Sequence, residues 1–159
     1  MDAPARQALA WLIRTQRIAA LGTLSDAAPL VSMVLYAAAA DLSAFYIHVS
    51  QLAQHTHALR QDRRVSLLIV ETDTGETDPQ TLTRVSLRGD AAETLPTVGD
   101  YAEGKAAYLA KFPGAAVTFG FGDFMLYRIT PHTARYVGGF GKIFDLAVED
   151  FRRIASMTP

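Results

Sequence analysis

The residues from 18 to 49, IAALGTLSDAAPLVSMVLYAAAADLSAFYIHV, carry the strongest fold signal in the chain. They contain short apolar runs at 18–24, 29–39 and 44–49, which are separated by the turn-forming segments SDAA and DLS. Short apolar runs divided by such segments are typical of consecutive antiparallel strands. We therefore expect a β-meander over these residues.

The strand pattern continues towards the C-terminus. Residues 64–71, RVSLLIVE, are apolar in both alternating sets, which is typical of a strand buried on both faces. Residues 82–95 alternate instead, so this strand has one apolar and one polar face. The apolar face comprises Val85, Leu87, Gly89 and Ala91, and the polar face comprises Arg84, Ser86, Arg88 and Asp90. The segments 123–130 and 133–140 predict a further strand pair around Pro131.

Helical signals occur in four segments, which lie at 4–17, 51–61, 97–111 and 145–157. The first has apolar residues at helical spacing behind Asp2, a residue type that favours helix N-caps, and the second is polar and almost free of β-branched residues. The polar residues 72–81 predict a loop. The whole pattern predicts a β-barrel with peripheral helices, built from six or seven mainly antiparallel strands in a single domain over 1–159.

Composition excludes several classes of function. The 159 residues include no cysteine, so disulfides, thiolate metal sites and cysteine nucleophiles are excluded. The formal net charge of −1 argues against a nucleic-acid binder that relies on bulk charge. No window approaches ~18 uninterrupted apolar residues, and the N-terminal residues lack the apolar stretch of a secretion signal. We expect a cytoplasmic protein that binds neither membranes nor nucleic acid.

Three of the four histidines, His48, His55 and His57, lie within ten residues and suggest a metal site at first sight. On the expected helix His55 and His57 are two residues apart, so they point to different faces and cannot chelate one ion together. No acidic residue occurs between Asp41 and Asp62 to complete a ligand set. We expect no metal site, and we expect His48 and His57 to be structural. The pattern assigns no catalytic residue.

The corner between the strand at 44–49 and the helix at 51–61 favours an anion instead. Ser50 and the backbone N–H groups after it would lie at a helix N-terminus, where free donors and the helix dipole stabilise a phosphate. His55 and Thr56 supply further donors about one turn on. Positive charge nearby comes from Arg60, Arg63 and Arg64.

The glycine-rich segment 137–144, VGGFGKIF, fits neither a dinucleotide fingerprint nor a P-loop. Two interpretations stay open: a flexible bend before the last helix, or a lip whose aromatic residues and Lys142 cover a flat anionic ligand. The polar face with Arg84 and Arg88 has two interpretations as well, because it either lines a ligand site or faces solvent.

Several motifs occur in a familiar order: PLVSMVLYA, SQLAQHTHALRQDRRVSLL, TRVSLRGDA, YLAKFPGAA and DFMLYRITPHTARYVGGFGK. In this succession, over about residues 5–146, the chain resembles the pyridoxamine 5′-phosphate oxidase-like, FMN-binding split-barrel proteins. Within them it is most similar to the haem-utilisation branch. The resemblance implies an FMN-binding split barrel that forms a homodimer, with one FMN at each of two sites across the interface.

The resemblance also implies a set of cofactor-binding residues. Those expected against the flavin ring and ribityl chain are Val31, Ser32 and Met33. Those expected at the phosphate are Ser50, Gln54, His55 and Thr56. Arg84 matches a polar flavin-contacting position, and Lys142 would approach the ligand from the C-terminal lip. The oxidase itself has a basic pair where this chain has Gln54 and His55, and its pyridoxine phosphate residues are not recognisable here, so its own activity is not expected.

Two functions follow from the resemblance. The first is an FMN-dependent oxidoreductase of unknown substrate, in which the protein supplies phosphate anchoring and a dry cleft. The second is a non-catalytic protein that binds flavin or haem in haem utilisation.

Overall fold

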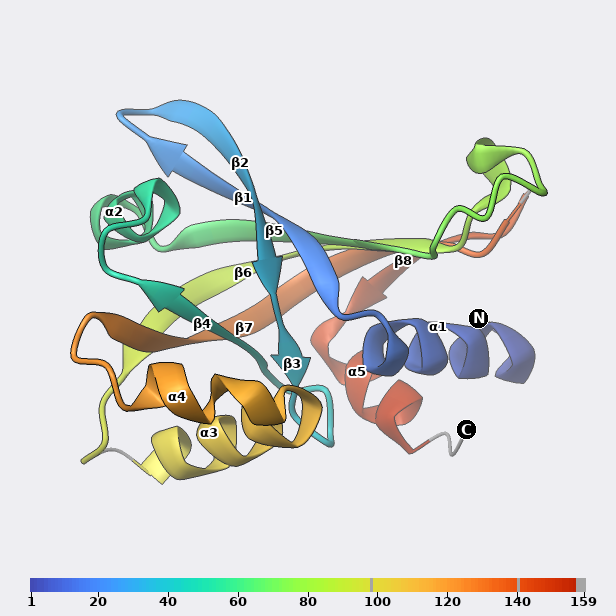
Figure 1. Cartoon of the computed structure of the whole chain (residues 1–159). Helices are drawn as coiled ribbons and strands as arrows, with labels where there is room; N and C mark the ends of the chain where they lie inside the picture. Colours follow the sequence, from blue (N-terminus) through green and yellow to red (C-terminus); the bar gives the residue numbers. More distant parts are fainter. Residues whose placement is uncertain (98, 140, 157–159) are drawn as a thin grey trace.

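The computed structural model describes residues 1–97, 99–139 and 141–156, and its centre is one curled antiparallel sheet (Figure 1). Val98, Phe140 and Met157, which the predicted elements included, lie outside the described residues. Neighbouring strands follow the order β2-β1-β5-β6-β7-β4-β3, and β8 pairs with β7. The strands are β1 (Ile18–Ser25), β2 (Ala28–Leu35), β3 (Ala37–Ala38), β4 (Phe45–Ser50), β5 (Arg64–Val70), β6 (Arg84–Thr94), β7 (Phe124–Val137) and β8 (Ile143–Ala147). The predicted β-barrel with peripheral helices is confirmed.

The sheet closes through a single residue. β2 lies at one end of the strand order and β3 at the other, yet only Tyr36 separates them in the chain. Tyr36 is fully buried, and its hydroxyl donates a hydrogen bond of 2.7 Å to the carbonyl of Ile13. Lys111 lies over the same ring, with its Nζ 4.1 Å from the ring centroid. The chain therefore passes from one edge of the sheet to the other across a well-anchored side chain.

Strand alternation separates an inner from an outer face. Leu21 pairs with Leu67, Leu67 with Leu87, and Leu87 with Ala134, and all four side chains are buried. Each leucine buried in such a row stabilises the fold by roughly 1.5–3 kcal/mol. The predicted alternation of residues 84–91 is confirmed, because the odd-numbered side chains are buried and the even-numbered ones are not.

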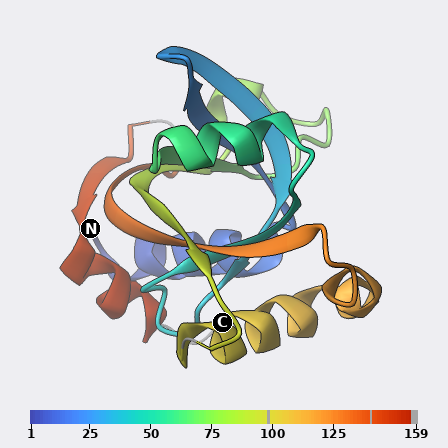
Figure 2. The same ribbon diagram turned by 90° about the vertical axis from the view of Figure 1, so that its left-hand side faces the viewer.

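Helices surround this core. They are α1 (Ala3–Thr15), α2 (Gln54–Gln61), α3 (Gly99–Lys111), α4 (Ala116–Phe119) and α5 (Val148–Ala155), with short 3-10 turns at Pro79–Thr81 and Pro113–Ala115. The Asp2 side chain caps α1 by accepting from the N–H of Ala5 at 2.9 Å, and α1 packs against α5. Figure 2 shows α2 lying across one side of the curled sheet and α3 below it. Among the described residues no helix has both the length and the apolar character needed to cross a membrane.

Several predicted bounds were wrong. The run 29–39 is two strands, because the chain pairs with β1 as far as Leu35 and with β4 from Ala37. The second helix begins at Gln54, not at 51, and the last begins at Val148 because 143–147 pairs with β7 as β8. α4 was not predicted.

The predicted strand pair around Pro131 is one continuous strand, β7. Residues 124–129 pair with β4 and residues 133–137 with β8, so Pro131 lies in the gap between these two partners. A proline, which lacks an N–H, is tolerated where the ladder is already interrupted. On the β6 side the register shifts between Arg88 and Gly89 at this point.

The shift is a β-bulge. Arg88 pairs with Thr133 and Gly89 with Pro131, which leaves His132 as the extra residue of β7. A Cβ atom on Gly89 would collide with the carbonyl oxygen of Thr130, so only glycine fits. Bulges of this kind redirect side chains and are frequent beside functional sites.

Candidate functional site

The outer face of β2, β1 and β5 carries an apolar hollow. A cavity of about 500 Å³ is lined by Val31, Ser32 and Met33 together with Ile18 and Leu68. Val31 and Met33 are 70% and 67% exposed, which is unusual for large apolar side chains in adjoining positions. Contiguous apolar surface of this kind marks ligand or protein contact sites.

Strand register places these side chains together. Met33 pairs with Ala20, Ala20 with Leu68, and Leu68 with Ser86, so one row crosses four strands on the same face. Small residues in β1 leave the hollow open between the longer side chains of β2 and β5. All three predicted flavin-ring residues, Val31, Ser32 and Met33, line the cavity, although the side chain of Ser32, which pairs with buried Leu21, lies on the opposite face of β2.

A second group lies at the corner between β4 and α2. Ser50 ends β4, and its Oγ accepts from the N–H of Leu52 at 3.2 Å. Thr56 is fully buried, and its hydroxyl donates to the Ser50 carbonyl at 2.6 Å, so it holds the corner together. Ala53, not Ser50, is the N-cap of α2, and its side chain makes no capping bond. The helix therefore starts without a side-chain cap.

The first turn of α2 offers donors. Gln54 is exposed, and among the described residues no acceptor is present for the backbone N–H of Gln54 or His55. The Nε2 atom of His55 is buried without a hydrogen-bond partner, and burial lowers the pKa of this imidazole, so it is neutral near pH 7. Neutral donors and the helix N-terminus, rather than formal charge, would attract an anion at this corner.

Two further predicted residues lie at the other end of the outer face. Arg84 pairs with Val70, which lines the apolar hollow, but its Nη1 donates to the carbonyls of Gln80 and Leu82 at 3.1 and 2.9 Å. Lys142 is exposed just before β8, and its carbonyl accepts from the N–H of Gly138 at 2.9 Å. Neither residue lines the hollow, so their contact with a flavin stays a prediction.

His48 has a structural environment. Its ring stacks on Phe119 with the centroids 3.7 Å apart, and its Nδ1 lies 3.3 Å from the Thr118 hydroxyl. Burial, assisted by the charge of Lys105, lowers the pKa of His48 to about 4. His57 is exposed. Within the ranges that the structure describes, no three metal-ligating His, Asp or Glu residues gather.

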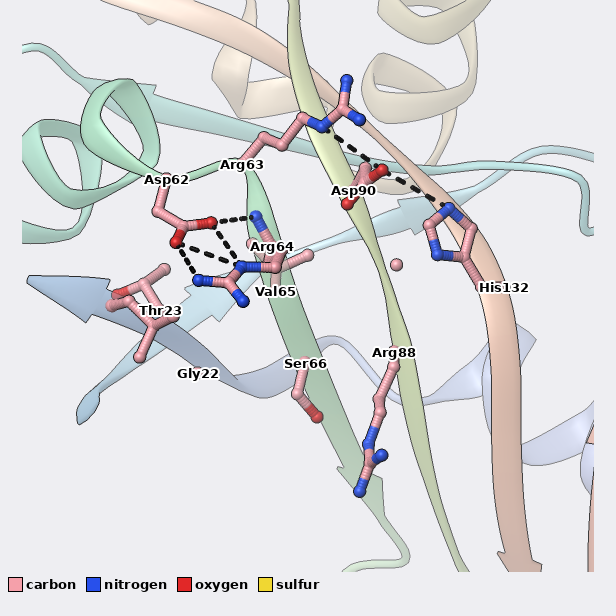
Figure 3. Close-up of a pocket in the computed structure, with 12 residues that line it drawn as sticks. Gly22, Thr23, Asp62, Arg63, Arg64, Val65, Ser66, Arg88, Asp90 and His132 are labelled. Atoms are coloured by element: carbon pink, nitrogen blue, oxygen red, sulfur yellow. Dashed lines mark hydrogen bonds and ion pairs between the residues drawn. The ribbon is translucent and has the colours of Figure 1, made fainter. Parts of the chain in front are cut away.

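A larger cavity, of about 680 Å³, lies on the outer face near the β-bulge (Figure 3). Its charged side chains are Asp62, Arg63, Arg64, Arg88, Asp90 and His132. From the sequence, Arg63 and Arg64 were expected only as positive charge near the β4–α2 corner, Arg88 had two interpretations, and no role was predicted for His132. The bulge that brings His132 to Asp90 depends on pairing between distant strands, so local spacing does not reveal it.

Comparison with known proteins decides the family. The pyridoxamine 5′-phosphate oxidase family model matches residues 5–138. The chain belongs to this family. No curated protein matches the sequence.

Solved structures agree with this membership. A haem-binding protein from Mycobacterium smegmatis is 27% identical with a TM-score of 0.84, and the match covers 96% of this chain and 62% of that protein. The chain described here therefore spans about three fifths of the length of the Mycobacterium smegmatis protein.

Two more distant structures share the fold alone. The haem storage protein HutZ from Vibrio cholerae is 19% identical, with a TM-score of 0.66 and 89% of each chain covered. A FAD-binding protein from Mesorhizobium loti is 17% identical, with a TM-score of 0.62, 84% of this chain and 92% of that chain covered.

Proposed function

We propose that this protein is an FMN-binding flavoprotein that acts as an oxidoreductase on a substrate still to be identified. The observation that carries the proposal is the apolar hollow with Val31, Ser32 and Met33 on its wall. A flat, mostly apolar ring needs such a surface, and a cavity of about 500 Å³ lies within the usual range for small-molecule sites. Family membership supports the same choice of ligand.

The corner at the start of α2 suits the phosphate. Ser50, Gln54 and His55 would bind it through a hydroxyl group and backbone N–H groups, and Thr56 fixes the corner by its bond to the Ser50 carbonyl. The buried, unpartnered Nε2 of His55 is a polar atom that still lacks a hydrogen bond. A bound oxygen atom would satisfy it, provided the neutral ring carries its proton there.

The protein's own contribution is binding and exclusion of water. Bound FMN supplies hydride or electron transfer. Val31 and Met33 would cover the ring, Ser32 would offer a hydrogen bond, and Arg84 and Lys142 would approach from the far end of the face. No side chain at the hollow is placed as a general acid or base.

We also propose that two copies of the chain pair through this face. Ile18, Val31, Met33 and Leu68 form an exposed apolar patch around the hollow. A second copy seated on the patch would bury these side chains and close the hollow against water.

A second candidate is a non-catalytic haem-binding protein. The 27% identity and TM-score of 0.84 to a haem-binding protein favour it. The same apolar hollow would accept a porphyrin, but none of the four histidines lines it. We therefore rank haem below FMN.

The visible spectrum of the purified protein, with mass spectrometry of the released ligand, tests both candidates. Oxidised-flavin bands that bleach with a reduced nicotinamide and recover in air support the oxidoreductase. A flavin that binds but is not reduced supports a flavin carrier. A Soret band on addition of hemin, without any flavin affinity, contradicts the first proposal and supports the second.

A further inference from the structure

The larger cavity near the β-bulge has a charge balance of its own. Arg64 is paired with Asp62 by several hydrogen bonds between 2.5 and 3.1 Å. Arg63 Nε lies 3.4 Å from the Oδ2 atom of Asp90. Both aspartates of the cavity are therefore engaged by neighbouring arginines. We call this space the arginine cavity; its lining residues are given by Figure 3.

Arg88 is the remaining cation. Within the described residues its guanidinium has neither an acidic partner nor a hydrogen-bond acceptor, although it lines the arginine cavity and the adjoining cavity of about 580 Å³. The three arginines and two aspartates of the cavity together carry one net positive charge. Such a balance suits a monoanion, because a monoanion neutralises the net charge of these side chains, whereas a dianion would leave the site negative.

The β-bulge shapes the other end of the cavity. His132 is the extra residue of β7, and its Nε2 lies 3.6 Å from Oδ2 of Asp90. Figure 3 shows Arg88 on the Ser66 side of the cavity and His132 beside Asp90 on the far side. The arrangement needs Gly89, whose missing Cβ permits the close approach of Thr130.

The floor on the other side of Arg88, across β5 and β1, is open. Gly22, in the middle of β1, pairs with Ser66 and presents no side chain, although a Cβ there would make only ordinary contacts at 3.6 Å with Ser66. Leu24 contributes an apolar wall. A ligand with a compact apolar body can therefore lie over Gly22 while its charged group meets Arg88.

We propose that the arginine cavity is a binding site for a small organic monocarboxylate, with Arg88 holding the carboxylate and the apolar body lying over Ser66 and Gly22. A guanidinium matches a carboxylate through two parallel hydrogen bonds. The site uses none of the residues assigned to the flavin, so it stands or falls independently of the FMN proposal.

Benzoate is the probe, and benzamide is its neutral counterpart of the same shape. The protein as purified is titrated while NMR follows the imidazole CH signals of His132, assigned with His132→Gln. We expect benzoate to shift these signals saturably, with Kd in the ~mM range typical of a ligand of this size, and benzamide to bind at least tenfold more weakly. Arg88→Gln should weaken benzoate at least tenfold and leave FMN affinity unchanged.

Two further variants make the test specific. Gly22→Leu fills the floor and should abolish the shift, with circular dichroism confirming the fold. Arg153→Gln removes the same charge from an exposed site on α5 and should leave benzoate affinity unchanged. Equal affinity for benzoate and benzamide, equal benzoate affinity in Arg88→Gln, or no saturable shift of the His132 signals would each overturn the proposal.

Discussion

The ring of His48 lies 3.7 Å from the ring of Phe119, with the two planes only 5° from parallel. Tyr108 meets the same imidazole edge-on at 5.8 Å. The three rings join α3 and α4 to β4, so the packing of these two helices against the sheet depends on a histidine that stays neutral. Protonation would place a charge inside an aromatic cluster and beside Lys105.

This arrangement predicts a stability that depends on pH. The folded pKa of His48 is lowered to about 4 from its usual 6.5, so the unfolded chain binds the proton more readily than the folded chain. The contribution is fully present above about pH 6.5 and decreases as the pH falls towards 4. Because the side chain is partly exposed, we expect a loss of about 1–2 kcal/mol rather than the full value.

Urea unfolding at pH 7 and pH 4.5 measures this effect. His48→Phe should remove that part of the pH dependence, whereas His57→Gln, at an exposed position, should retain it. Identical pH profiles for wild type and His48→Phe would contradict the assignment.

Met33→Glu tests the apolar hollow. A carboxylate there would have to be desolvated beneath a flavin ring or a second copy of the chain, so we expect loss of FMN binding and of dimerisation. The melting temperature of the flavin-free monomer should change little, because Met33 is 67% exposed in the single chain. Fluorescence titration and light scattering provide the measurements.

Val117→Glu is the matched control for Met33→Glu. Val117 is 64% exposed on α4, away from the sheet face, so its variant should keep FMN affinity and oligomeric state. Parallel losses in both variants would show that Met33 has no specific role.

Ser50→Ala tests the phosphate corner. Removing one hydroxyl that contacts a charged group should cost about 1–2 kcal/mol of FMN affinity, or roughly a 5- to 30-fold increase in Kd. Riboflavin has no phosphate, so its Kd should be the same in both proteins. A parallel change for riboflavin and FMN would place the phosphate elsewhere.

Gln54→Lys should act in the opposite direction. The first residue of α2 is exposed, and an added cation there would attract the phosphate more strongly, at a cost of about 0.3–1 kcal/mol in helix stability from the dipole. We expect tighter FMN binding at low salt and a gain that disappears as ionic strength rises. A salt-independent affinity would exclude the electrostatic explanation.

Gly89→Ala tests the β-bulge. Its new methyl group would meet the Thr130 carbonyl oxygen, so the backbone must shift, and we expect a destabilisation of about 2 kcal/mol or more. Gly22→Ala adds the same group where only ordinary contacts await it and should be nearly neutral. Chemical denaturation compares the two variants, and equal stabilities would mean that the bulge relaxes freely.

Much of the fold could be predicted because its signals are local. The alternation of 84–91 and the helical spacing of 4–17 depend only on neighbouring residues, and both were confirmed. β8 was not predicted, because its residues run without a break into the pattern of the last helix. Only pairing with β7 makes them a strand. The break between β2 and β3 at Tyr36 was not predicted, because a tyrosine within an apolar run favours a continuous strand.

The candidate site also has features that local sequence predicts and features that it does not. The sequence placed Val31, Ser32 and Met33 on one strand, and the register of β1 then made them the wall of a cavity. The commitment of Thr56 and Arg84 to backbone carbonyls depends on the turn geometry around them, which spacing does not specify. The meeting of His132 with Asp90 depends on a bulge between two distant strands.

The position of Tyr36 also constrains how the sheet can unfold locally. Leu35 pairs with Ile18 and Ala37 with Tyr46, so the two outermost ladders are linked by one residue. A change of register in the β1–β2 pair would therefore displace the β3–β4 pair as well, and the reverse also holds. We therefore expect the hydrogen-bonded amides of β2 and β3 to exchange through a shared opening, with similar protection in the two strands.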